Sequence, residues 1–362
     1  MIGRRGHDRP GGRMSYRVIQ WATGGVGRAA IGGVLAHPEL ELVGCWVHSE
    51  AKDGKDVGEI CGREPLGIQA TRDVDSLLAV EADCVIYSPV MGQEGEVLRI
   101  LEAGKNVVTP LGWFFPFAST DVTKLEAACR AAGVTLHGTG IHPGGITERF
   151  PLMVSALCRD VRHVRAEEFS DIRSYAAEFV VREVMLFGKT PAEAARSPML
   201  GILGGGFCQS IDMVAQALGI ELDSEKRTQH EMAVATRKIA TPVGPIEPGR
   251  VAAQRFTWQG TRRGEPVMTV CTNWLMGEQH LDPPWRLGGE RFEVEIDADP
   301  PVAVTFHGIH PETQGQRQEP NPGIVATANH CVNAVPYVCA AEPGIKTYLD
   351  LPLVSGRYAQ DR

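Results

Sequence analysis

The chain has 362 residues, which is enough for two domains at roughly 100–200 residues each. Hydrophobic residues make up 43% and charged residues 22%, and these near-average values exclude a disordered or fibrous chain. The net charge is −8, with no Lys/Arg cluster beyond the first residues and no apolar run of about 18 residues. Nucleic acid and membrane are therefore not expected partners.

The nine cysteines form no C-x-x-C pair, and their odd number does not suggest a disulfide framework. A reducing cytoplasm is therefore the expected location. Residues 1–15 begin with an Arg- and Gly-rich stretch without apolar periodicity, and no signal-peptide core follows it. We expect a disordered leader there.

From Tyr16 onward, β-rich runs alternate with helical patterns. We expect strands at 16–21, 40–48, 83–87, 106–109 and 134–137, and helices at 28–37, 76–80, 94–103 and 121–132. Repeated strand–helix units predict an α/β Rossmann domain with a doubly wound parallel sheet over residues 16–150.

After residue 150 the pattern changes to alternating polar and apolar positions, typical of strands with one wet face. Such strands are expected at 161–169, 231–239, 249–258, 267–276 and 291–297, and helices at 148–157, 176–187, 191–195 and 209–218. They predict an α+β domain for substrate binding and dimerisation over 151–322, with a mostly antiparallel sheet.

The C-terminal segment 323–362 is expected to return to the first domain. It contains a helical pattern at 324–335, which we expect to end at Pro336. A sheet with one open face is often covered by a helix layer or a partner, so we predict a homodimer through the second domain.

A Gly-rich turn, Ala22 to Gly27, lies between the first strand and the first helix, as in a dinucleotide fingerprint. Gly24 would let the backbone approach a pyrophosphate, and Gly27 would let the helix pack closely on the strand. Ala22 replaces the first Gly of the G-x-G-x-x-G pattern, and a connector without a ligand is the alternative. We predict that this turn binds NAD(P) through Thr23, Gly24, Gly25, Val26 and Gly27.

The second strand ends at His48 and Ser49, and Lys52 and Lys55 follow shortly after. Hydroxyl and basic donors suit a 2′-phosphate, whereas an acid at this place would bind ribose hydroxyls. His48, Ser49 and Lys52 therefore favour NADP(H), while Glu50 keeps NAD(H) open. Solvated loop charges are the alternative for both lysines.

Hydride transfer to an imine or a ketone needs a proton donor near the accepting atom. His142 lies in a Gly/Pro loop after a predicted parallel strand, at the sheet edge where ligands bind. We predict His142 as this donor and Glu148, six residues on, as the second candidate. The alternatives are a structural loop residue for His142 and helix N-terminal stabilisation for Glu148.

Three further acids, Glu167, Glu168 and Asp171, cluster in the first strand of the second domain. Only alternate strand residues share a face, so Glu167 and Glu168 cannot both point into a cleft. We expect a solvated face for this cluster.

An aromatic group, Trp113, Phe114, Phe115 and Phe117, follows a strand end, and either an apolar substrate wall or core packing explains it. His307 and His310 lack partners at metal-ligand spacing, so no metal site is predicted. No G-x-S-x-G elbow exists for a Ser nucleophile.

Several segments occur in a recognisable order: Ala22–Gly27, Ser88-Pro89, Gly104–Val108, Gly138–Gly144 and Ala328–Pro336. With them the chain resembles the dihydrodipicolinate reductase-like oxidoreductases, in the 2,4-diaminopentanoate dehydrogenase and native amine dehydrogenase branch. The resemblance spans about residues 16–355. It implies a Rossmann domain, an α+β second domain, a nicotinamide cofactor and carbon–nitrogen oxidoreduction, usually as a dimer. Expected cofactor contacts within these segments are Ser88, Pro89, Gly140 and Asn333.

The sequence departs from this group at three places. Residues 109–116 contain no acid, although amine dehydrogenases of the branch place an amine-binding carboxylate there, and His142 replaces an Asn. The His-rich, Lys-containing segment of true dihydrodipicolinate reductases is also missing.

The expected function is an NAD(P)H-dependent oxidoreductase. It would transfer hydride to or from a C=N or C=O carbon of a small, rather apolar amine, ketone or aldehyde. The alternatives are a dinucleotide-binding sensor or scaffold without catalysis, and a carbonyl reductase with no nitrogen chemistry.

Overall fold

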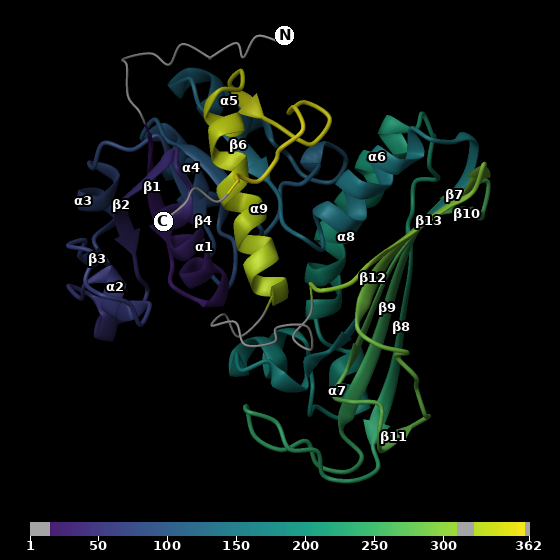
Figure 1. The fold of residues 1–362 in the computed structure, drawn as a ribbon. Helices are drawn as coiled ribbons and strands as arrows, with labels where there is room; N and C mark the ends of the chain where they lie inside the picture. The colour runs from purple at the N-terminus through teal and green to yellow at the C-terminus, as the bar shows by residue number, and fades with distance from the viewer. Residues whose placement is uncertain (1–14, 310–321, 359–362) are drawn as a thin grey trace.

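Two seven-stranded sheets organise the computed structural model, which describes residues 15–309 and 322–358 (Figure 1). The leader expected at residues 1–15 and His310 fall outside the described residues, apart from Ser15. No helix in these two ranges is long and apolar enough to cross a membrane.

The first sheet is parallel throughout, with the strand order β14-β6-β5-β4-β1-β2-β3. Short apolar runs form its central strands, which are buried on both faces as in doubly wound sheets. Its strands are β1 (Tyr16–Trp21), β2 (Leu40–Trp46), β3 (Ala70–Thr71), β4 (Cys84–Tyr87), β5 (Asn106–Thr109), β6 (Thr135–Gly138) and β14 (Gly344–Ile345).

Helices cover both faces of this sheet. On one face α1 (Gly25–Ala36) and α9 (Pro322–Cys339) pack side by side, and Ile31, Val34, Val335 and Val338 are buried there. On the other face lie α3 (Val74–Leu78), α4 (Glu94–Glu102) and α5 (Thr123–Ala132). The short elements η1 (Glu50–Lys52), α2 (Val57–Ile60) and η2 (Pro116–Ala118) occupy the connections.

The second sheet has the order β11-β8-β9-β10-β7-β12-β13 and is antiparallel except for the β7–β10 pair. In β12 the apolar positions are buried while Glu295, Asp297 and Asp299 are exposed, as expected for a strand with one wet face. The strands are β7 (Arg159–Asp171), β8 (Arg227–Ala235), β9 (Val251–Arg262), β10 (Glu265–Leu275), β11 (Leu281–Asp282), β12 (Arg291–Asp299) and β13 (Val302–Phe306).

The helix α8 (Met199–Ala217) packs on one face of this sheet, where Phe207 stacks on Trp258 at 4.4 Å between ring centroids. With α6 (Phe150–Ser155) it lies on the side toward the first domain, and no described helix covers the other side (Figure 1). The remaining elements are η3 (Gly145–Arg149), η4 (Ile172–Ser174), η5 (Val180–Val184) and α7 (Pro191–Ala195).

These sheets confirm the predicted fold class, a Rossmann-type parallel sheet with a second, mostly antiparallel one. Two helix predictions are wrong. The helix α9 does not end at Pro336 but continues to Cys339, because Val335 and Val338 remain packed in the core beneath the first sheet. The segment predicted as helix 176–187 forms only the short helical element Val180–Val184, and Val181 within it and Phe187 after it are buried.

Candidate active site

The Gly-rich turn joins β1 to α1 and leaves open space in front of the helix N-terminus. A Cβ atom added at Gly24 would meet no protein atom within 4 Å, whereas one added at Gly27 would lie 2.1 Å from the carbonyl oxygen of Ala22. Gly27 is therefore needed for close packing of α1 on β1, and Gly24 keeps the space free for a ligand. Ala22 adopts a φ of +76°, the conformation that a glycine at this place would provide.

A cavity of about 410 Å³ opens at this turn, and we call it the turn cavity. Its lining includes Gly24, Gly25 and Val26 of the turn together with Ser88 and Pro89, which follow β4. The Gln20 amide donates a 2.9 Å hydrogen bond to the Ser88 hydroxyl and so ties the two loops together. The free amide groups at the start of α1 make this cavity suitable for a pyrophosphate.

The predicted ribose-reading residues lie at the end of β2. His48 and Ser49 are exposed, and the His48 ring lies edge-on to Trp46. The Lys52 ammonium donates to the Thr23 hydroxyl at 3.0 Å, so it stands directly beside the Gly-rich turn. Lys55 is exposed on the loop that follows.

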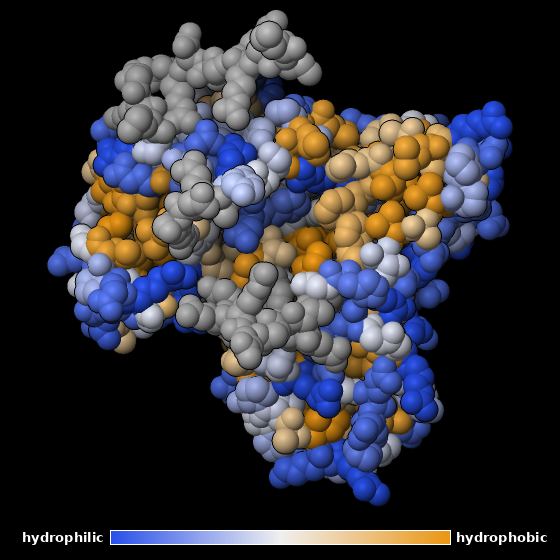
Figure 2. Space-filling model, viewed as in Figure 1, coloured by the Kyte–Doolittle hydropathy of each residue, from blue (hydrophilic) through white to orange (hydrophobic). Residues whose placement is uncertain are grey.

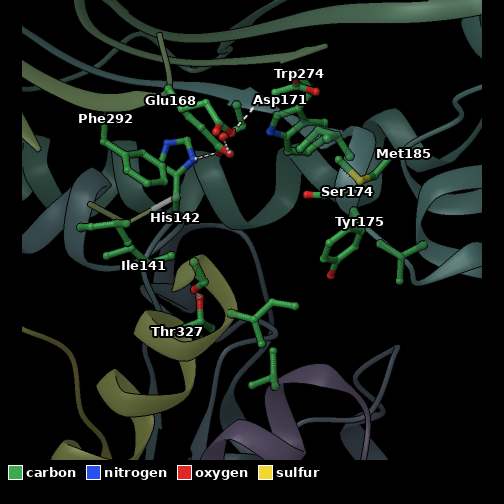
Figure 3. Close-up of a pocket in the computed structure, with 18 of the residues that line it drawn as sticks. Ile141, His142, Glu168, Asp171, Ser174, Tyr175, Met185, Trp274, Phe292 and Thr327 are labelled. Atoms are coloured by element: carbon green, nitrogen blue, oxygen red, sulfur yellow. Dashed lines mark hydrogen bonds and ion pairs between the residues drawn. The ribbon is translucent and has the colours of Figure 1, made fainter. Parts of the chain in front are cut away.

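A second cavity of about 300 Å³ lies between the two domains, and we call it the interdomain cavity (Figure 3). Val26 of the turn and Ile324 of α9 line both cavities, as do Ser174, Tyr175 and Val180 from the second domain. The two cavities are thus neighbours that share a wall. A ligand bound along the turn can extend into the space between the domains.

His142 lines the interdomain cavity and is paired with an acid. Its Nδ1 lies 2.8 Å from Oε2 of Glu168, and the Ser170 hydroxyl donates to Oε1 of the same carboxylate at 2.7 Å (Figure 3). The imidazole packs against Phe207 and Phe292, and its Nε2 is buried without a hydrogen-bond partner among the described residues.

The loop that carries His142 is anchored by the C-terminal part of the chain. The Thr139 and Tyr348 hydroxyls are hydrogen-bonded, and His330 Nδ1 donates to the carbonyl of Gly140. Burial lowers the pKa of His330 to about 4, so this ring is neutral and its Nε2 accepts from Arg149 at 2.9 Å. Gly140 therefore anchors the loop through its carbonyl oxygen, and it lines neither cavity.

Glu168 corrects the expectation of a solvated acidic cluster, because its side chain is only 13% exposed. The alternation expected in β7 holds: Glu167 lies on the opposite face, where Asn273 donates to it at 2.8 Å and Arg165 forms an ion pair with it. Asp171 also lines the interdomain cavity, with both oxygens bound by Arg173.

Glu148 is fully buried and does not line the cavity. The Ser210 hydroxyl donates to its Oε1, and burial raises its pKa to about 8. The acid is therefore protonated near neutral pH inside the protein, and we do not retain it as the donor to a substrate.

For the aromatic segment after β5, the packing favours the core over a substrate wall. Phe114 and Phe115 are 2% and 4% exposed and pack with Met213, and Trp113 is partly buried against the core of the first domain. Aromatic side chains do line the interdomain cavity, but they come from three separate segments: Tyr175, Trp274 and Phe292. Because these three residues are far apart in the sequence, their position in one cavity could not be predicted from residue spacing.

The first turns of the C-terminal helix reach both cavities through Ile324, and Thr327 lines the interdomain cavity. Asn333, predicted as a cofactor contact, lies further along α9 near Gly356 and lines neither cavity. Among the described residues no group of three or more His, Cys, Asp or Glu could hold a metal ion.

Known protein families match both an N-terminal and a C-terminal part of the chain. The profile of the dihydrodipicolinate reductase N-terminus matches residues 17–109, and the profile of the 2,4-diaminopentanoate dehydrogenase C-terminal domain matches residues 146–362. An amine dehydrogenase of Streptomyces virginiae is 31% identical over 92% of this chain and 96% of the relative. A 2,4-diaminopentanoate dehydrogenase of Acetoanaerobium sticklandii is 25% identical over 91% and 92%.

The fold has a close counterpart among solved structures. An amine dehydrogenase from Mycobacterium smegmatis superposes with a TM-score of 0.75 at 21% identity, over 94% of this chain and 97% of that one. This likeness concerns the fold.

The raised pKa of Glu148 leads to a testable dependence of stability on pH. Between pH 4.5 and 8 the folded protein keeps a proton on Glu148 that the unfolded chain releases. The free energy of unfolding therefore falls as pH rises through this window. Glu148→Gln removes this loss, so the unfolding temperature of the variant relative to wild type should rise from pH 5 to pH 8. Thermal unfolding curves that stay parallel across the series would contradict the assignment.

Proposed function

The chain belongs to the 2,4-diaminopentanoate dehydrogenase family, and its residues 17–109 match the N-terminus of dihydrodipicolinate reductase. From this premise we propose that this dinucleotide-dependent oxidoreductase interconverts a primary amine and its carbonyl compound. The observation that carries the proposal is the shared wall of the two cavities, formed by Val26, Tyr175 and Ile324. It brings the ligand space of the Gly-rich turn beside the His142–Glu168 pair.

The residues present fit a dinucleotide. The turn at Gly24 offers an uncovered cradle at a helix N-terminus, and Ser88 and Pro89 border it. A dinucleotide held there would supply the hydride acceptor for oxidation of the substrate carbon. The overall oxidation is balanced: a primary ammonium ion, water and oxidised cofactor yield a carbonyl compound, ammonium, reduced cofactor and one proton.

The protein side chains orient the substrate and move the proton. In the interdomain cavity, the pair of His142 and Glu168 stands at one end and can exchange a proton with the reacting nitrogen. Met185, Trp274 and Phe292 give the cavity an apolar wall that excludes water from the substrate carbon.

The cavity lining also sets the substrate class. Its described lining contains the carboxylates Glu168, Asp171 and Glu290 but no Lys or Arg. A substrate carboxylate would meet these acids without a cationic partner, whereas an ammonium ion is attracted to them. We therefore propose small amines with apolar substituents and no carboxylate of their own.

The cofactor proposal is tested by Gly24→Val. The added Cβ meets no protein atom within 4 Å, and the side chain fills the ligand space, so the variant should lose at least about tenfold in affinity for NADPH and NADH, or about 1.4 kcal/mol. Cofactor fluorescence titration measures this loss. Gly95→Val in α4, where the added Cβ also meets no protein atom, is the matched control and should bind like wild type. Unchanged binding by Gly24→Val would refute the assignment of the turn.

We further propose a preference for NADP(H), because the ammonium of Lys52 lies at the turn, where a 2′-phosphate would gain a charged hydrogen bond. Such a bond contributes about 1.5–3 kcal/mol, so Lys52→Ala should lower NADPH affinity by about tenfold or more and leave NADH affinity nearly unchanged. Lys55→Ala is the control on the same loop. Equal losses for both cofactors, or a wild type that prefers NADH, would overturn the preference.

We propose that the protein is a homodimer formed through the uncovered face of the second sheet. This face presents both charge signs, with Arg165 paired to Glu295 and Arg255 to Glu231. Hydrophobic side chains also gather at α6, on the opposite side of this sheet (Figure 2), and such patches mark association surfaces as well. Met153 in α6 and Leu157 just after it are 48% and 68% exposed. Light scattering should give twice the chain mass of 39.2 kDa; a 39.2 kDa species at micromolar concentration would contradict the dimer.

The cytoplasm remains our proposed location. None of the nine cysteines, all of which lie within the described residues, forms a disulfide, and this suits a reducing compartment.

A further inference from the structure

We propose that Glu168 is the residue that binds the substrate nitrogen, and that His142 acts on Glu168 rather than on the substrate. The inference rests on the proposed amine chemistry and assigns the acid that holds the nitrogen to β7 of the second domain. Residues 109–116, which follow β5 of the first domain, contain no acid at all. The wall opposite the Gly-rich turn therefore supplies it.

The exposure of the two partners indicates which one meets a ligand. The side chain of His142 is 1% exposed, held between Phe207 and Phe292, while the side chain of Glu168 is 13% exposed. Their contact uses Nδ1, the ring nitrogen that Figure 3 shows directed at Glu168 beside the cavity. Glu168 thus stands between the histidine and the space that a substrate would occupy.

The other two acids of the cavity have structural contacts around the end of β7. Both oxygens of Asp171 accept hydrogen bonds from Arg173, at 2.8–3.0 Å from its Nε. Oε1 of Glu290 accepts from the backbone N–H of Asp171 at 2.9 Å. Glu168 differs because its partner is an imidazole, a group that can both accept and donate a proton.

This arrangement accounts for the proton in the oxidation. The substrate ammonium binds to the Glu168 carboxylate, an N–H bond breaks and an O–H bond forms on Glu168. With a dinucleotide bound, the neutral amine would give up hydride from its carbon as the nitrogen lone pair forms the C=N bond. His142 Nδ1 takes the proton from Glu168 and so restores the carboxylate. The proton returns through Glu168 to solvent when the product leaves the cavity. Ser170 holds the second carboxylate oxygen in place throughout.

The chain offers a matched control one residue away. Glu167 neighbours Glu168 on β7 but faces the other side of the sheet, where it contacts Asn273 and Arg165. Glu167→Gln therefore removes the same charge from the same strand without touching the cavity.

The experiment compares Glu168→Gln, Glu168→Asp, His142→Asn and Glu167→Gln in the full chain. Reduction of butanone and cyclohexanone by NADPH is followed at varied ammonium concentrations. Glu168→Gln should lose about 10²–10⁴-fold in kcat/KM for ammonium, with an unchanged dissociation constant for NADPH. His142→Asn should lower kcat by about 10–100-fold with little change in the KM for ammonium, as a positioning residue does. Glu168→Asp should keep part of the ammonium affinity, and Glu167→Gln should behave as wild type.

A second measurement separates this inference from the proposed function. Calorimetry follows the binding of sec-butylamine to the enzyme–NADPH complex, which needs no turnover. Binding that weakens at least about tenfold in Glu168→Gln but not in Glu167→Gln supports the role of Glu168. Equal binding in both variants overturns it, even where wild type turns over the ketones. A wild type that binds the amine but shows no ammonium-dependent turnover contradicts the proposed function instead.

Discussion

The close packing of α9 on α1 is the contact on which the geometry of the site depends. Gly33 of α1 makes it possible, because a Cβ atom there would lie 2.9–3.0 Å from the side chains of Asn329 and Val332. With the helices this close, Ile324 comes within 3.1 Å of a Cβ position at Gly25 and becomes a wall of both cavities. The C-terminal helix α9 and the N-terminal Gly-rich turn therefore form the walls of the site together.

The second domain contributes the opposite wall through β7. This strand follows the loop of His142 after η3 and α6, and it places Glu168 in contact with His142, with Ser170 bound to the same carboxylate. Alternation along β7 then divides its acids between two environments. Glu168 faces the cavity, while Glu167 joins the ion pairs on the outer face.

Much of the architecture could be predicted from local patterns. The strand, the Gly-rich turn and the helix at residues 16–36 follow from spacing and residue type, and so do the central parallel strands. His142 was predicted as a residue near the sheet edge because parallel strands end together, and the structure places it on the interdomain cavity.

The rest depends on contacts between distant segments. No local pattern distinguishes Phe114, which packs in the core, from Phe292, which lines the cavity 178 positions later. Glu148 looked like a catalytic acid from its place after the loop, but α8 covers it through Ser210. The role of Glu168 likewise became visible only through its distance to His142, since charge alone suggested a solvated face.

A crystal structure of the protein with NADPH and sec-butylamine tests most directly the claim that the two cavities form one active site. The account predicts the pyrophosphate at Gly24 and Gly25, the nicotinamide where Val26 and Ile324 join the cavities, and the amine nitrogen within hydrogen-bond distance of Glu168. A cofactor bound away from the turn, or an amine nitrogen held by residues 109–116 instead of Glu168, would contradict it.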